Sequence, residues 1–105
     1  MKNVASRKTD RPVMALLDLL GRRWALRVLW ELRAARLNFR SLLQATGVSP
    51  SVLNTRLAEL REAEIVDHDA NDGYGLTPGG HDLLARLMPL QQWAEAWARR
   101  RKSER

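Results

Sequence analysis

Between Phe39 and Thr77 the chain carries, in unbroken succession, the signals of a short helix, a turn, a second helix and a tight hairpin. Asn38 is a good N-cap for a helix over Phe39 to Thr46, and Gly47 can end that helix in the left-handed conformation. A small domain with this order of elements can present its second helix to a DNA groove. We therefore predict a helix-turn-helix followed by a β-hairpin.

The second of these helices has a strong start signal. Ser49 is placed to cap it and Pro50 to be its first residue, and the helix should run to about Ala63. Steps of four and three residues place three leucines on its inner face: Leu53, Leu57 and Leu60. The same periodicity turns small and mostly polar residues away from the core: Ser51, Asn54, Thr55 and Ala58.

Two short strands are predicted after this helix, over Ile65 to Ala70 and Tyr74 to Leu76. The residues between them, Asn71, Asp72 and Gly73, favour a hairpin turn. Residues 36–38 are long enough for a stub of edge strand. The predicted fold class is therefore α+β, a winged helix-turn-helix that is mainly helical, with a short β-hairpin wing and a long C-terminal dimerisation helix.

Apolar helices flank this region. Residues of an N-terminal helix that Gly21 can close share one face, namely Val13, Leu16, Leu17 and Leu20. The next helix should bury Trp24, Val28, Leu29 and Leu32. Thr77 and Pro78 begin the longest helix, which should run to about Arg100 and carries a wide stripe that includes Leu87, Leu90, Trp93 and Trp97.

That stripe is broader than a lone domain of this size needs. We therefore expect the first and last helices to form a homodimer interface through Val13, Leu16, Leu17, Leu20, Leu87, Leu90, Trp93 and Trp97.

Length and charge limit the remaining possibilities. A chain of 105 residues matches one domain, which we place at residues 12–100, between a flexible basic arm at 1–11 and a basic tail at 101–105. Its formal net charge of +6 favours a polyanionic partner such as double-stranded DNA. The chain has no cysteine, which excludes thiol chemistry, and no apolar stretch long enough to predict a membrane span. A cytoplasmic protein is expected.

Several short motifs resemble the HxlR-type winged helix-turn-helix regulators over about residues 12 to 98. The distinctive ones are a G-x-[KR]-W step at residues 21–24 and a Y-x-L-T-x-x-G ending at residues 74–80. The resemblance implies a bacterial or archaeal homodimer that binds operator DNA through the Ser49 to Ala63 helix and pairs through its first and last helices. An inverted-repeat operator follows, with half-site centres one helical turn, about 34 Å, or a multiple of it apart.

The chain departs from the family pattern at three places. Arg11 stands where many relatives carry a cysteine, so thiol sensing is not expected. Glu64 stands where the family usually has a glycine, at the end of the recognition helix. If the left-handed conformation is kept there, this substitution destabilises the fold by about 1 kcal/mol. The wing is short and its acidic residues, Asp67, Asp69 and Asp72, should repel the DNA backbone.

The predicted DNA contacts fall in two groups. Short donors and acceptors that suit base edges lie on or beside the second helix: Ser49, Ser51, Asn54, Thr55 and Arg56. Arginines near helix starts suit phosphates: Arg22, Arg23 and Arg40. The alternative is that these are ordinary solvated residues, and that Arg56 pairs with Glu59 or Glu62.

A different class of function is an interaction module with little DNA affinity. In that interpretation Trp24, Trp30, Trp93 and Trp97 line a pocket for a protein or a small hydrophobic effector. Packing in the core and the dimer interface is the competing explanation for them. No catalytic, cofactor or metal site is predicted, since strand alternation turns His68 away from Asp67 and Asp69.

Overall fold

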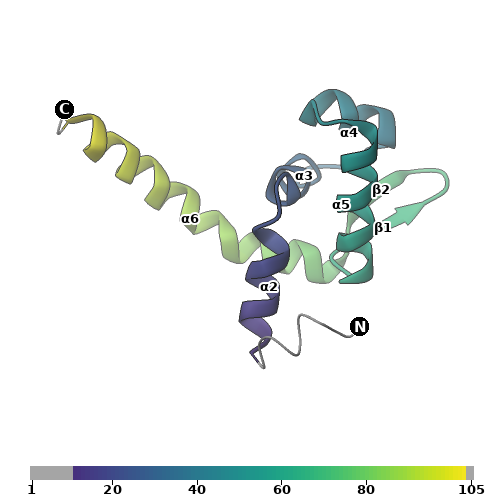
Figure 1. The fold of residues 1–105 in the computed structure, drawn as a ribbon, viewed down its shortest axis with the longest axis horizontal. Coiled ribbons are helices and arrows are strands. Elements are labelled where there is room, and N and C mark those ends of the chain that lie inside the picture. Colours follow the sequence, from purple (N-terminus) through teal and green to yellow (C-terminus); the bar gives the residue numbers. More distant parts are fainter. Residues whose placement is uncertain (1–10, 104–105) are drawn as a thin grey trace.

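The computed structural model describes residues 11–103, which form five helices and a two-stranded antiparallel sheet (Figure 1). The predicted α+β class and winged helix-turn-helix order are confirmed. Residues 1–10 of the predicted arm and 104–105 of the predicted tail lie outside the described residues. The elements are α2 (Pro12–Leu20), α3 (Ala25–Glu31), α4 (Phe39–Thr46), α5 (Pro50–Glu62), β1 (Val66–Asp69), β2 (Gly73–Leu76) and α6 (Pro78–Ser103).

The caps of the helix-turn-helix are those that the sequence predicts. The Asn38 side chain accepts a hydrogen bond from the Ser41 backbone N–H at 2.8 Å, at the start of α4. Gly47 ends α4 in the left-handed conformation, with φ of 72°. The Ser49 hydroxyl accepts from the Val52 N–H at the start of α5. These local signals fix the turn between the two helices.

One hydrophobic core joins α3, α4, α5 and the sheet. Its most completely buried side chains include the three leucines predicted on the inner face of α5: Leu53, Leu57 and Leu60. Val28, Leu29 and Leu32 meet them from the α3 segment, and Leu42 from α4. The predicted inner face of α5 and the predicted burial of Val28, Leu29 and Leu32 are therefore confirmed, whereas Trp24 is only partly buried.

The hairpin pairs Val66 with Leu76 and Asp69 with Gly73 at its two ends. The first strand is shorter than the predicted Ile65 to Ala70, and the second begins one residue earlier than the predicted Tyr74. Leu37 adds the expected edge strand as a single bridge to Tyr74, with two backbone hydrogen bonds of 2.8 and 2.9 Å. Gly73 has a φ of 80°, and a Cβ there would lie 2.6 Å from the Leu37 carbonyl oxygen, so both conformation and space require glycine.

The turn between α2 and α3 differs from expectation. Gly21 follows α2 with a right-handed φ of −78°, whereas Trp24 takes a left-handed φ of 78° before α3 begins. A left-handed conformation at a tryptophan is strained by roughly 1–2 kcal/mol. Local sequence favours glycine for that conformation, so tertiary contacts must hold Trp24 in it.

Helix α6 continues beyond the expected Arg100 to Ser103 and passes through Pro89 without a break. Its first half packs against the core through Leu83, Leu84 and Leu87. Its second half extends away from the other elements (Figure 1). Among residues 11–103, no helix combines the length and the apolar composition that crossing a membrane would need.

Candidate DNA-binding surface

The outer side of α5 carries a continuous exposed strip, which we call the recognition face, formed by Ser51, Asn54, Thr55 and Ala58. All four side chains are solvent-exposed, as the helical periodicity predicts. The Thr55 hydroxyl donates to the Ser51 carbonyl at 3.0 Å, so its oxygen can still accept a hydrogen bond from a partner. Ser49 is exposed beside the first turn. The recognition face is therefore small enough for the α5 backbone to approach a partner closely.

Arg56 is the member of the predicted contact set that the structure places elsewhere. Its Nε donates to the Arg23 carbonyl oxygen at 2.7 Å and its Nη1 to Glu59 Oε1 at 3.1 Å. Its side chain is only 20% exposed. In this structure the guanidinium is held within the chain, and the alternative pairing with Glu59 is the one observed.

The predicted phosphate-binding arginines lie in different settings. Arg22 pairs with Glu59 Oε2 at 2.9 Å, and Arg23 lies over the Trp24 ring at 4.9 Å. The hydrogen bond from Arg56 to Arg23 brings the turn that carries both arginines against α5. Arg40 is exposed in the first turn of α4 and is joined to the others by no contact among the described residues.

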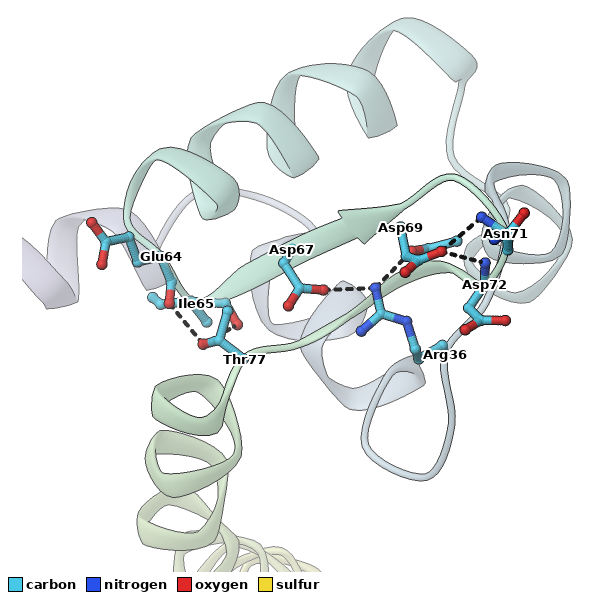
Figure 2. Close-up of polar contacts among 9 residues, drawn as sticks. Arg36, Glu64, Ile65, Asp67, Asp69, Asn71, Asp72 and Thr77 are labelled. Carbon is cyan, nitrogen blue, oxygen red and sulfur yellow. Dashed lines mark hydrogen bonds and ion pairs between the residues drawn. The ribbon is translucent and has the colours of Figure 1, made fainter.

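Two of the acidic side chains of the wing, Asp67 and Asp69, have hydrogen-bond or ion-pair partners within the protein. Figure 2 shows that Arg36 reaches from the edge strand to Asp67, with Nη2 2.6 Å from Oδ1, and it also donates to the Gly73 carbonyl at 2.8 Å. Asp69 accepts from the backbone N–H groups of Asn71 and Asp72, at 2.7 and 3.1 Å. Those hydrogen bonds, with a smaller contribution from Arg36, lower the pKa of Asp69 below the ordinary aspartate value.

Glu64 keeps the left-handed conformation that the family's glycine would favour, with φ of 62°. Thr77 compensates by bridging the two ends of the hairpin, because its hydroxyl donates to the Glu64 carbonyl at 2.7 Å (Figure 2). The same oxygen accepts from the Gly80 N–H at the start of α6. Gly80 packs so closely on the Ile65 carbonyl that a Cβ would collide with it. Gly80 therefore allows the start of α6 to pack closely on the segment before β1.

The residues predicted for the dimer interface divide into two groups. Leu20 is only 6% exposed and belongs to the core of the protomer, so little of its side chain is left for the predicted interface. Leu16 and Leu87 pack against that core while remaining partly accessible. The others are well exposed: Val13, Leu17, Leu90, Trp93 and Trp97. Met14, Leu26 and Met88, which were not predicted for the interface, are further exposed apolar residues.

The four tryptophans do not form one pocket. Trp24 packs against the core, while Trp93 and Trp97 stack on each other along α6 at 5.9 Å. Trp30 alone of the four lines an open apolar groove of about 390 Å³ between α3 and α6, which we call the α3–α6 groove. Its walls also include Leu26, Leu84 and Met88.

No cluster of side chains that could bind a metal ion is present in the part of the chain that the structure describes. His68 packs on the Tyr74 ring at 4.5 Å, and no three metal-binding side chains among residues 11–103 converge. The sequence reasoning included the pairing of Glu59 with Arg56 but missed the ion pairs of Glu59 with Arg22 and of Arg36 with Asp67. Both missed pairs join segments that are distant in the chain, whereas Arg56 and Glu59 have the spacing of neighbours on one helix face.

The model of the HxlR-like helix-turn-helix family matches residues 19–102. The chain belongs to this family. It is 28% identical over 103 residues to an HTH-type transcriptional regulator of Mycobacterium tuberculosis, in a match covering 92% of this chain and 65% of that protein. The chain thus spans a little under two thirds of this relative's length. A regulator of Methanocaldococcus jannaschii is 25% identical over 89 residues, which cover 80% of this chain and 83% of the relative.

Solved structures of similar fold include HxlR-like proteins. The quinone-bound YodB of Bacillus subtilis superimposes with a TM-score of 0.76 at 31% identity, covering 82% of this chain and 98% of YodB. A possible HxlR family transcriptional factor from Thermoplasma volcanium gives 0.72 at 26% identity, covering 85% and 86%. A MarR-type regulator of Enterococcus faecalis shares the fold alone, with a TM-score of 0.76 at 24% identity, covering 98% and 96%.

Proposed function

We propose that this HxlR-like protein is a sequence-specific transcriptional regulator that acts in the cytoplasm as a homodimer. The observation that carries the proposal is the recognition face: four small, exposed side chains on a helix whose opposite side is fully buried. Such a face allows the backbone to approach base edges in the major groove.

In this proposal Asn54 and Thr55 contact bases, and Ser49 and Ser51 contact bases or the adjacent backbone. Arg22, Arg23 and Arg40 contribute phosphate contacts, whose loss should weaken binding to all sequences alike. We leave Arg56 out of the contact set, because its guanidinium donates to two acceptors within the chain and its side chain is only 20% exposed, whereas that of Arg22 is 44% exposed. The short wing, with Asp69 and Asp72 at its tip, makes no phosphate contact.

The dimer pairs through the exposed residues of α2 and the second half of α6. Val13 and Leu17 supply one patch, and Leu90, Trp93 and Trp97 the other. A two-fold dimer requires an inverted repeat, with half-site centres about 34 Å or a multiple apart.

Selection from a random duplex library at moderate salt tests this function. The purified protein should enrich one inverted repeat, and Asn54→Ala or Thr55→Ala should each weaken binding to it by about 1–3 kcal/mol while the protein stays dimeric. Gln92→Ala, an exposed polar residue on α6, is the matched control and should bind normally. Enrichment of no sequence over random duplex would remove the specific form of the proposal.

A second candidate is the interaction module with a small hydrophobic effector. The α3–α6 groove favours it, as does the quinone-bound state of YodB. Because Trp30 lines the groove, an aromatic effector bound there should quench tryptophan fluorescence, and Trp30→Phe should remove most of that change. If Asn54→Ala and Thr55→Ala leave every measured activity intact, the module replaces the regulator.

A further inference from the structure

The turn that joins α2 to α3 is tied to the recognition helix by a small polar network. Its members are Arg22, the Arg23 carbonyl, Arg56 and Glu59, which we call the turn network. Both carboxylate oxygens of Glu59 are used, Oε2 by Arg22 at 2.9 Å and Oε1 by Arg56 at 3.1 Å. The network therefore joins two elements that are more than thirty residues apart in the chain.

The backbone at this turn is strained where the network holds it. Trp24 has a φ of 78°, and the carbonyl that accepts from Arg56 is the one immediately before it. A strained non-glycine residue persists only when its surroundings over-determine it. The hydrogen bond of 2.7 Å from a guanidinium to this carbonyl is charge-assisted and fixes the orientation of that peptide.

The turn is the direct continuation of α2, one of the two helices through which we propose that the dimer forms. Within α2, which the structure describes in full, only the last residue, Leu20, is buried. Leu16 and Leu19 pack on the core while remaining partly accessible, and Val13 and Leu17 are exposed. The angle between α2 and α5 therefore depends on a few leucines at the end of α2 and on the turn network that follows it.

Arg56 and Glu59 are also partly shielded from solvent, with side chains 20% and 26% exposed. They lie on α5 between its buried leucines and the recognition face. An arginine that donates to two acceptors on different segments, the Arg23 carbonyl and Glu59, is a more rigid link than a surface ion pair between flexible side chains.

From these contacts we propose that Arg56 and Glu59 are positioning residues that hold α5 at a fixed angle to α2, and so set the separation of half-sites that the dimer accepts. The inference rests on the proposed function, since it assigns a role within DNA recognition. It predicts that breaking the network changes which spacing is bound, whereas loss of a base contact changes which base is bound.

The first measurement needs neither DNA nor a dimer. The chain has no cysteine, so spin labels can be placed at Asp18→Cys on α2 and Ala58→Cys on α5, both exposed positions. Labelled protein diluted into excess unlabelled protein gives the distance between these helices within one protomer. We expect one narrow distribution in the parent and a clearly broader or shifted one with Arg56→Gln or Glu59→Gln. Glu62→Gln, which removes an exposed carboxylate on the same helix that has no ion pair among those of the described residues, should leave it unchanged.

The second measurement uses the inverted repeat that the unmodified protein selects. Half-site spacing is varied by two base pairs in each direction, beside an isolated half-site. The parent should prefer one spacing by about tenfold. With Arg56→Gln this preference should fall to about twofold, while affinity for the isolated half-site stays within about twofold. Glu59→Gln should lose the spacing preference in the same way, and its half-site affinity is not used as a criterion because it also releases Arg22. Thermal melting shows whether each variant is folded, and titration with duplex gives the fraction of protein that is competent to bind DNA. If Arg56→Gln does not fold, Arg56→Lys replaces it.

The outcomes separate the two proposals. Distance distributions as narrow as the parent's in both network variants would overturn the inference. So would broadened distributions with an unchanged spacing preference, or equal losses on the isolated half-site and on every spacing, which is the behaviour of a direct DNA contact. If the unmodified protein selects no operator, the proposed function fails, while the distance measurement still decides whether the network positions α5.

Discussion

The helix-turn-helix body and the projecting half of α6 carry similar apolar stripes with opposite fates. In the body, Leu29, Leu42 and Leu57 are almost completely buried by residues of the same protomer. In α6 beyond Met88, Leu90 is 60% exposed and Trp93 56%. Leucines at helical spacing therefore identify an apolar face that is to be buried, but they do not identify what buries it. In the body, other elements of the same protomer bury this face. The projecting half of α6 stays exposed within one protomer, so we propose that a second copy of the chain buries it.

The largest expected effect compares one leucine from each region. Leu57→Ala should lower the free energy of unfolding by about 2–5 kcal/mol, because it leaves a cavity in a closed core. Leu90→Ala should change the stability of the protomer by less than about 1 kcal/mol, since its side chain is already accessible. Urea unfolding of both variants at several protein concentrations separates the two terms. A large, concentration-independent loss for Leu90→Ala would show that α6 is covered within the protomer.

The next effect tests what covers the projecting helix. Trp97→Ala removes an exposed aromatic that stacks on Trp93 and lies under Arg101 at 5.2 Å. If this surface is the centre of the dimer interface, the variant should weaken self-association by about 2 kcal/mol or more, roughly thirtyfold. Sedimentation equilibrium measures it, with Gln92→Ala as the control. An unchanged dissociation constant would place the interface elsewhere.

A smaller effect sharpens the comparison from the side of the body. Glu64→Gly should raise the free energy of unfolding by about 1 kcal/mol, because glycine adopts the φ of 62° without strain. The gain should be the same at every protein concentration, unlike the effect of Trp97→Ala. Glu64→Ala removes the charge and keeps the strain, so it should not reproduce the gain. If alanine stabilises as much as glycine, the charge and not the conformation is responsible.

The smallest effect concerns the wing. The folded pKa of Asp69 is lowered, so its contribution to stability is present above the ordinary aspartate pKa of about 4 and is lost as the pH falls through the lower folded pKa. The melting temperature of Asp69→Ala should therefore lie below that of the parent at neutral pH and approach it under strong acid. Asp72→Ala serves as the control, since it removes a charge from the same turn without removing this acceptor. A gap that widens on acidification would contradict the assignment.

Much of the body could be predicted because its signals are local. Asn38, Gly47 and Ser49 act on backbone groups within a few residues, so the bounds of α4 and the start of α5 follow from the sequence. The hairpin likewise follows from its turn residues. The periodicity of α5 correctly divided its leucines from the recognition face, because a helix of known start has a fixed arrangement of side chains.

The sequence predicted the surroundings of a side chain least well where they depend on which helices and turns pack together. Leu20 and Leu17 both lie on the apolar side of α2, yet Leu20 is buried in the core and Leu17 is 53% exposed. Arg56 has the spacing of a DNA contact, but the turn before α3 lies within its reach and supplies an acceptor. Neither difference is encoded in spacing along one helix.

The sequence by itself determined the order of the elements, their caps, and the polar side of α5, because these depend on backbone hydrogen bonds and side-chain periodicity over a few residues. Only the tertiary structure decided that Trp24 adopts the left-handed conformation, that Arg36 offsets the charge of Asp67, and that Arg56 joins α5 to the turn before α3. The physical reason is that a strained φ or an ion pair between distant segments is stabilised by groups that come together only when the chain has packed.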